Sequence, residues 1–93
     1  MRLKQNEITA ILESVKNFDA GALVYLFGSR VYDEKKGGDI DLLILSSKIG
    51  MIEKRRILTL ICDRIGEQKI DIIVASDVNK PFVKIALEEG VKL

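Results

Sequence analysis

The chain has 93 residues, enough for one modest hydrophobic core, so we expect a single domain spanning residues 1–93. Its formal net charge is +1, from 15 basic and 14 acidic residues, and we therefore expect no direct nucleic-acid or membrane-surface binding. It has no histidine and one cysteine, Cys62, which excludes Ser-His-Asp and Cys-His catalysis, His-ligated zinc and an internal disulfide within the chain. No apolar run approaches the ~20 residues of a membrane span, and the first residues do not resemble a signal peptide, so we expect a cytoplasmic protein.

The first part of the sequence predicts a helix followed by a strand. Over residues 4–17 apolar side chains recur at helical spacing, with Asn6 as the expected amino-terminal cap. That stripe consists of Ile8, Ile11, Leu12 and Val15. Residues 22–27 then form a continuous apolar run between Gly21 and Gly28, which is typical of a strand buried on both faces and covered by helices.

A second strand and a second helix follow. The strand is the apolar run over residues 40–45. The helix is expected over residues 50–65, with Ser46 or Ser47 as its cap and Gly66 just past its end. Its expected inward stripe consists of Ile57, Leu58, Ile61, Cys62 and Ile65.

The last part of the sequence predicts a third strand and a short helix. The strand covers residues 69–75 and, like the second one, carries an aspartate near its start. Pro81 is expected to open the helix and Gly90 to end it. The side chains expected to face inward are Phe82, Ile85 and Ala86.

This order of elements, helix-strand-turn-strand-helix-strand-helix, predicts an α/β (α+β) fold with a small mixed three-stranded sheet, in the order 1-2-3, flanked by helices. The second and third strands are joined through a helix, so we expect them to be parallel, whereas the short connection between the first two favours an antiparallel pair. Gly28, Asp39, Asp41 and Asp71 would then converge on one edge of the sheet.

The aspartates at this edge indicate metal-assisted chemistry. Asp39 and Asp41 are two positions apart, so in a strand they project from the same face and repel each other unless a cation lies between them. Mg²⁺ prefers oxygen ligands and brings substrate phosphates with it, which points to phosphoryl or nucleotidyl transfer. The alternatives are that Asp39 and Asp41 accept backbone hydrogen bonds at the strand start, and that Asp71 pairs with Lys69 or an arginine.

These residues resemble the signature of the DNA polymerase beta nucleotidyltransferase superfamily. The matching features are Phe27-Gly28-Ser29, then Asp39-Ile40-Asp41-Leu42, then a single Asp71 at the head of a later strand. The match spans residues 22–75, and the small size is similar to that of the minimal nucleotidyltransferase (MNT) branch. The Gly-x-Gly-x-x-Gly and Walker patterns are absent, which excludes Rossmann and P-loop sites.

The resemblance implies a role for each residue of the motif. Asp39, Asp41 and Asp71 would be the catalytic and metal-binding carboxylates and would hold two Mg²⁺ ions. Gly28 and Ser29 would bind the terminal phosphates of a nucleoside triphosphate, most favourably ATP. Arg30, together with the Lys35-Lys36 pair in the following loop, could neutralise the triphosphate.

The resemblance also implies a biological setting. Minimal members of the family commonly act with a small helical partner, either a HEPN ribonuclease toxin or a helical substrate-binding protein, so we expect such a partner or a homodimer. The leading hypothesis is a nucleotidyltransferase that transfers AMP to a hydroxyl on the partner and acts as an antitoxin. The alternatives are a non-catalytic module that neutralises its partner by contact, and a small-molecule nucleotidyltransferase.

Overall fold

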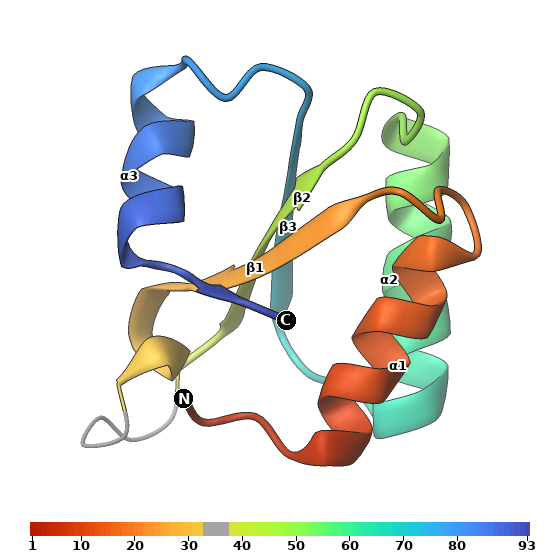
Figure 1. Ribbon diagram of the computed structural model, residues 1–93. Helices are drawn as coiled ribbons and strands as arrows, with labels where there is room; N and C mark the ends of the chain where they lie inside the picture. The colour runs from red at the N-terminus through yellow and green to blue at the C-terminus, as the bar shows by residue number, and fades with distance from the viewer. Residues whose placement is uncertain (33–37) are drawn as a thin grey trace.

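The computed structural model describes residues 1–32 and 38–93 and shows helices on both faces of a sheet (Figure 1). No helix in the described ranges is long and apolar enough to cross a membrane. Three α-helices, one short 3₁₀ helix (η1) and four strands make up these ranges. In chain order they are α1 (Gln5–Lys16), β1 (Leu23–Phe27), η1 (Gly28–Val31), β2 (Ile40–Leu45), α2 (Met51–Ile65), β3 (Ile70–Ala75), α3 (Pro81–Glu89) and β4 (Val91–Lys92).

The sheet has the strand order β3-β2-β1-β4. As the sequence predicts, β1 and β2 are antiparallel, whereas β2 and β3 are parallel and joined through α2. The predicted order of the first three strands is therefore confirmed. The short strand β4 is an addition, since it pairs antiparallel with β1 and the backbone N–H of Leu93 donates to the carbonyl of Val24 at 2.9 Å. The sequence does not predict β4, because the two residues that follow Gly90 are too few to show the alternation typical of a strand.

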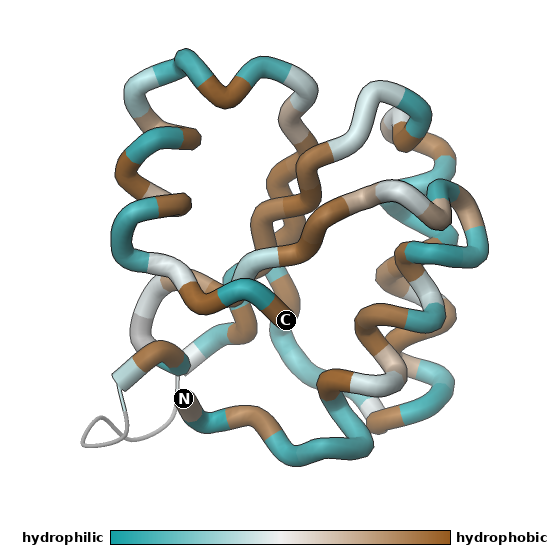
Figure 2. Tube along the Cα trace, in the orientation of Figure 1, coloured by the Kyte–Doolittle hydropathy of each residue, from teal (hydrophilic) through white to brown (hydrophobic). Residues whose placement is uncertain are grey.

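Helices α1 and α2 cover one face of the sheet and enclose the main hydrophobic core (Figures 1 and 2). Alternate residues of each strand enter this core because side chains alternate across a strand. The strand residues buried there are Val24, Leu26, Ile40, Leu42, Ile44, Ile70 and Ile72. Ile57 and Ile61 of α2 are fully buried against them, and the remaining residues of the predicted stripe are partly buried.

Helix α3 covers part of the opposite face (Figure 1). Val83 and Ala86 are buried there against Leu43 of β2. The prediction that Phe82 and Ile85 face inward is wrong, because their exposed fractions are 48% and 54%. α3 packs on the sheet mainly through Val83 and Ala86, with Leu87 partly buried beside them. This leaves Phe82 and Ile85 largely exposed.

The helix starts also differ from the sequence prediction. Asn6 is not the cap of α1, because the helix already begins at Gln5 and the Glu7 carboxylate accepts a hydrogen bond from the backbone N–H of Lys4 at 2.8 Å. Gly50 precedes α2, and Ser46 instead orders the turn before that helix. Its Oγ accepts hydrogen bonds from the backbone N–H groups of Lys48 and Ile49 at 3.0 and 3.1 Å.

Candidate active site

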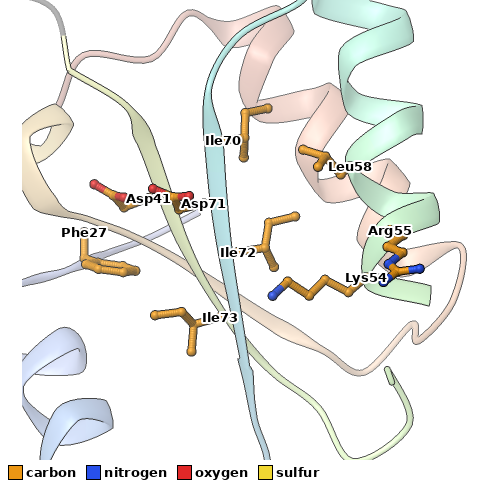
Figure 3. Close-up of a pocket in the computed structure, with 9 residues that line it drawn as sticks. All are labelled: Phe27, Asp41, Lys54, Arg55, Leu58, Ile70, Asp71, Ile72 and Ile73. Carbon is orange, nitrogen blue, oxygen red and sulfur yellow. The ribbon is translucent and has the colours of Figure 1, made fainter. Parts of the chain in front are cut away.

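Asp41 and Asp71 lie side by side at one end of the sheet. They are register partners in the parallel pair β2–β3, so their side chains project from the same face, as Figure 3 shows. Phe27, the last residue of β1, is the register partner of Asp41 on its other side. This is the face that carries α3, but α3 leaves Asp71 exposed and Asp41 partly exposed. Two carboxylates therefore meet at a solvent-accessible edge of the fold.

Gly28 lies directly against the carboxylate of Asp41. It follows β1 with a positive φ of 76°, which favours glycine. A Cβ atom built at this position would overlap the Oδ2 atom of Asp41. The glycine therefore lets the turn after β1 approach the carboxylate more closely than any other residue would.

Partial burial and the crowding of carboxylates both raise the pKa of Asp41. Partial burial is the largest cause, and the nearby charges of Asp71 and Asp39 raise the pKa further, while Lys69 lowers it. The ionised form of Asp41 is therefore electrostatically unfavourable in the folded protein. A cation placed among these oxygens would relieve that cost.

Asp39 is near this pair but has a cationic partner of its own. It lies just before β2 begins at Ile40, and one of its oxygens is 3.4 Å from the Nζ atom of Lys69. Both side chains are open to solvent, so this ion pair is weak and readily exchanged. Lys69 thus pairs with Asp39, whereas the sequence left open a pairing with Asp71.

The carboxylates of Asp41 and Asp71 supply some, but not all, of the ligands that a divalent cation needs. Among the residues that the structure describes, no three His, Cys, Asp or Glu side chains stand close enough to form a metal-binding group. Asp41 and Asp71 do offer adjacent carboxylate oxygens, the ligands that Mg²⁺ prefers, and Mg²⁺ often binds through one or two carboxylates plus substrate phosphates. The arrangement therefore suits an ion that arrives with a phosphate-bearing substrate.

The expected phosphate-binding residues lie on the turn after β1. Ser29 is the second residue of η1, and only its backbone is described. Arg30 donates from Nη1 to the carbonyl of Arg2 at 3.0 Å and from Nε to the carbonyl of Gly38 at 3.3 Å. Its guanidinium thus fastens the start of the chain to the segment before β2 and keeps further N–H groups for other acceptors. The Lys35-Lys36 pair lies outside the described residues.

A cavity of about 460 Å³ opens beside the two aspartates (Figure 3). It is lined by Phe27, Asp41, Lys54, Arg55, Leu58, Ile70, Asp71, Ile72 and Ile73. No sequence pattern assigns a role to Lys54 and Arg55, because their helical spacing places them only on the outward face of α2. Their place in the lining follows from the way α2 packs beside β3, which no local pattern reveals.

The aromatic ring of Phe27 forms one wall of this cavity. It meets Phe82 of α3 edge to face, with ring centroids 5.8 Å apart. This contact fixes the start of α3 beside the site.

The comparison with protein families agrees with the fold. The family described as polymerase beta, nucleotidyltransferase matches residues 6–93, nearly the whole chain. A comparison with curated proteins finds no match. The chain therefore belongs to the polymerase beta nucleotidyltransferase family.

Proposed function

We propose that this protein is an Mg²⁺-dependent nucleotidyltransferase that moves a nucleoside monophosphate, most favourably AMP from ATP, to a hydroxyl group. The observation that carries the proposal is the register pairing of Asp41 with Asp71 beside Gly28. Two adjacent carboxylates with a glycine turn at their side provide oxygen ligands and a close approach for phosphate within one small region.

In the proposed reaction, the hydroxyl oxygen of the acceptor forms a bond to the α-phosphorus, and the bond from that phosphorus to pyrophosphate breaks. The hydroxyl proton passes to the carboxylate of Asp71, which is the more exposed of the paired aspartates. Asp41 and Asp71 would hold Mg²⁺. Asp39, which pairs with Lys69 in this structure, would supply the further carboxylate for a second ion. The metal would stabilise the charge that develops on the phosphate oxygens. Gly28, Ser29 and Arg30 would bind the terminal phosphates.

The proposed acceptor is a hydroxyl on a partner protein, and the proposed role is that of the antitoxin in a HEPN/MNT-type pair. The support is that Asp71 is exposed at the rim of an open cavity, so a large acceptor can reach it. The family membership supports the transferase chemistry itself.

The test is an incubation of the purified chain, and of the partner that co-purifies with it, with Mg²⁺ and ATP labelled at the α-phosphate. Label should move to the partner, and Asp41→Ala should lower the rate about 100-fold or more, as expected when a main electrostatic contribution is lost. A tight complex that never becomes labelled would instead establish the alternative of a non-catalytic antitoxin. In a parallel incubation with small hydroxyl compounds added, label on those compounds alone would establish a small-molecule transferase.

A further inference from the structure

Strand β3 has one free edge. It is the terminal strand of the sheet and pairs only with β2 among the described elements. The carbonyls of Lys69 and Ala75 accept hydrogen bonds from the N–H groups of Ile40 and Ser46, at 3.1 and 3.0 Å. Because bonding direction alternates along a parallel strand, the outward N–H and carbonyl groups belong to the intervening positions 70, 72 and 74. An exposed row of such groups is a template for another strand.

The cavity beside the aspartates runs across this edge. Figure 3 shows Asp71 and Ile73 on one side of β3, and Ile70 and Ile72 on the other, where Lys54 extends from α2 toward the strand. Four consecutive residues of β3 line the cavity, with Phe27 and Asp41 on one face of the sheet and residues of α2 on the other, so the space wraps this edge strand and is not confined to a single face. The occupant that matches this shape is an extended chain segment.

The charges beside the edge differ on its two sides. Lys54 and Arg55 line the cavity on the α2 side, and within the described part of the chain neither side chain forms an ion pair. Asp41 and Asp71 lie on the other side. A segment that binds along the edge therefore meets positive charge on one face and the proposed reaction centre on the opposite face.

We propose that the free edge of β3 binds an extended segment of the acceptor protein as an additional strand, with an acidic side chain facing Lys54 and Arg55 and a hydroxyl-bearing side chain facing Asp71. The free edge of β3 and the side chains of Lys54 and Arg55 would provide the binding. The placement of a hydroxyl side chain opposite Asp71 rests on the proposed transferase function. Added strands lie ~4.8 Å away, and directly opposed side chains are ~5 Å apart at Cβ, so a hydroxyl on the new strand reaches the aspartates. Side chains alternate along a strand, so the acidic and hydroxyl residues occupy neighbouring positions.

A second copy of the chain fits this edge poorly. Two β3 strands paired across a two-fold axis would bring α2 of both copies to the same face of the extended sheet. The Lys54 side chain extends toward the middle of β3, so the cations of the two copies would face each other. An acidic partner segment avoids that repulsion.

The test uses a fluorescent peptide of four Glu-Tyr repeats with blocked ends, whose binding is measured by fluorescence anisotropy in the absence of nucleotide. The peptide should bind the wild-type chain, and Val74→Pro, which removes an outward N–H group, should weaken binding about tenfold. Val74→Ala keeps the N–H group and should bind like the wild type. Lys54→Glu with Arg55→Glu should also weaken binding about tenfold, whereas Arg56→Glu, one position outside the cavity lining, should not.

A peptide with alternate backbone N-methyl groups gives a measurement that requires no change in the protein. It should bind about tenfold more weakly if strand addition holds the segment. Equal binding of the methylated peptide, or equal binding of a Lys-Tyr peptide, would overturn the proposal. So would a dimer in sedimentation that Val74→Pro dissociates, because the edge would then belong to a second copy.

Failure of the transferase function is distinguishable from failure of this proposal. Peptide binding without nucleotide depends only on the edge and the two cations. Binding that follows these variants while no label is transferred would support the docking site and reject the chemistry.

Discussion

At the scale of single residues, the proposed chemistry depends on where a few carboxylates lie. Asp41 is held between Phe27 and Asp71 in the sheet register and beside Gly28 at the turn. Its pKa is raised by partial burial and by the charges of Asp71 and Asp39. A position that disfavours its own charged form is costly for folding and useful for binding a cation.

The raised pKa of Asp41 predicts how stability depends on pH. Because the folded state raises this pKa, the ionised carboxylate opposes folding at neutral pH. The cost shrinks as the pH falls below the raised value and is gone below the ordinary pKa of an aspartate, where the group is protonated in both states. Asp41→Asn should therefore be more stable than the wild type at pH 7 without divalent cations, by up to about 1 kcal/mol for a partly exposed group. Urea unfolding at neutral and acidic pH in the presence of a chelator measures this.

In the same experiment the advantage of Asp41→Asn should shrink toward acidic pH. Asp63→Asn, an exposed change on α2, should be neutral at both values. A variant that is clearly less stable than the wild type at neutral pH would show that Asp41 serves the fold and not the site.

The paired aspartates could be predicted from the sequence, and the partner of Asp39 could not. Asp41 and Asp71 each stand near the start of an apolar run, and parallel pairing then brings them together. The sequence also places Lys69 near that edge, but whether it faces Asp39 or Asp71 depends on the direction of a side chain before the strand begins. Lys54 and Arg55 could not be identified because their place depends on how α2 packs across β3.

At the scale of elements, α3 is held by its contacts at both ends. Its first turn contributes Phe82 to the ring contact with Phe27, and its last turn is followed by Gly90. The backbone N–H of Gly90 donates to the carbonyl of Ala86 at 2.8 Å, and the chain then continues into β4. Gly90 thus lies at the junction between the end of α3 and the sheet, close to the backbone of both.

The close approach at Gly90 predicts a cost for any side chain there. A Cβ atom would overlap the carbonyl oxygen of Ala86 and meet that of Leu26 at 3.0 Å, and both are backbone atoms that can move only with their elements. Gly90→Ala should therefore destabilise the protein by about 1–3 kcal/mol. Gly21→Ala is the matched control, because its Cβ would meet only a side-chain oxygen at 3.6 Å.

Urea unfolding of the two alanine variants measures the difference. Gly21→Ala should lie within about 0.5 kcal/mol of the wild type. Equal stability of the two variants would mean that the junction of α3 and β4 yields without cost, and that it does not fix α3 on the sheet.

The helices and strands could be predicted where a local sequence pattern, such as an apolar run or a glycine at a helix end, marks them. The apolar runs identify the three long strands, and Gly66 and Gly90 mark two helix ends correctly. The face of α3 was not predictable, because apolar residues occur on several sides of this helix and only its position over Leu43 selects Val83 and Ala86. The strand β4 exists only because β1 offers it an edge.

At the scale of the whole molecule, the main hydrophobic core and the proposed site lie on opposite faces of the sheet. The main core lies between the sheet and α1 and α2, whereas the aspartates project from the other face, which α3 covers only in part. Side chains that interact with a substrate can therefore be exposed without opening the core. The free edge of β3 lies at the boundary between these two sides, next to the site.

The central claim, that Asp41 and Asp71 together bind a divalent cation and a nucleotide, is tested most directly by calorimetric titration. The ligand is an ATP analogue with a methylene bridge between the α- and β-phosphates, titrated with and without Mg²⁺ into the wild type and into Asp41→Asn, Asp71→Asn and the control Asp63→Asn. We predict Mg²⁺-dependent binding to the wild type and to the control, and affinity at least about tenfold weaker for the other two variants. Equal affinity in all four proteins, or binding that ignores Mg²⁺, would contradict the account.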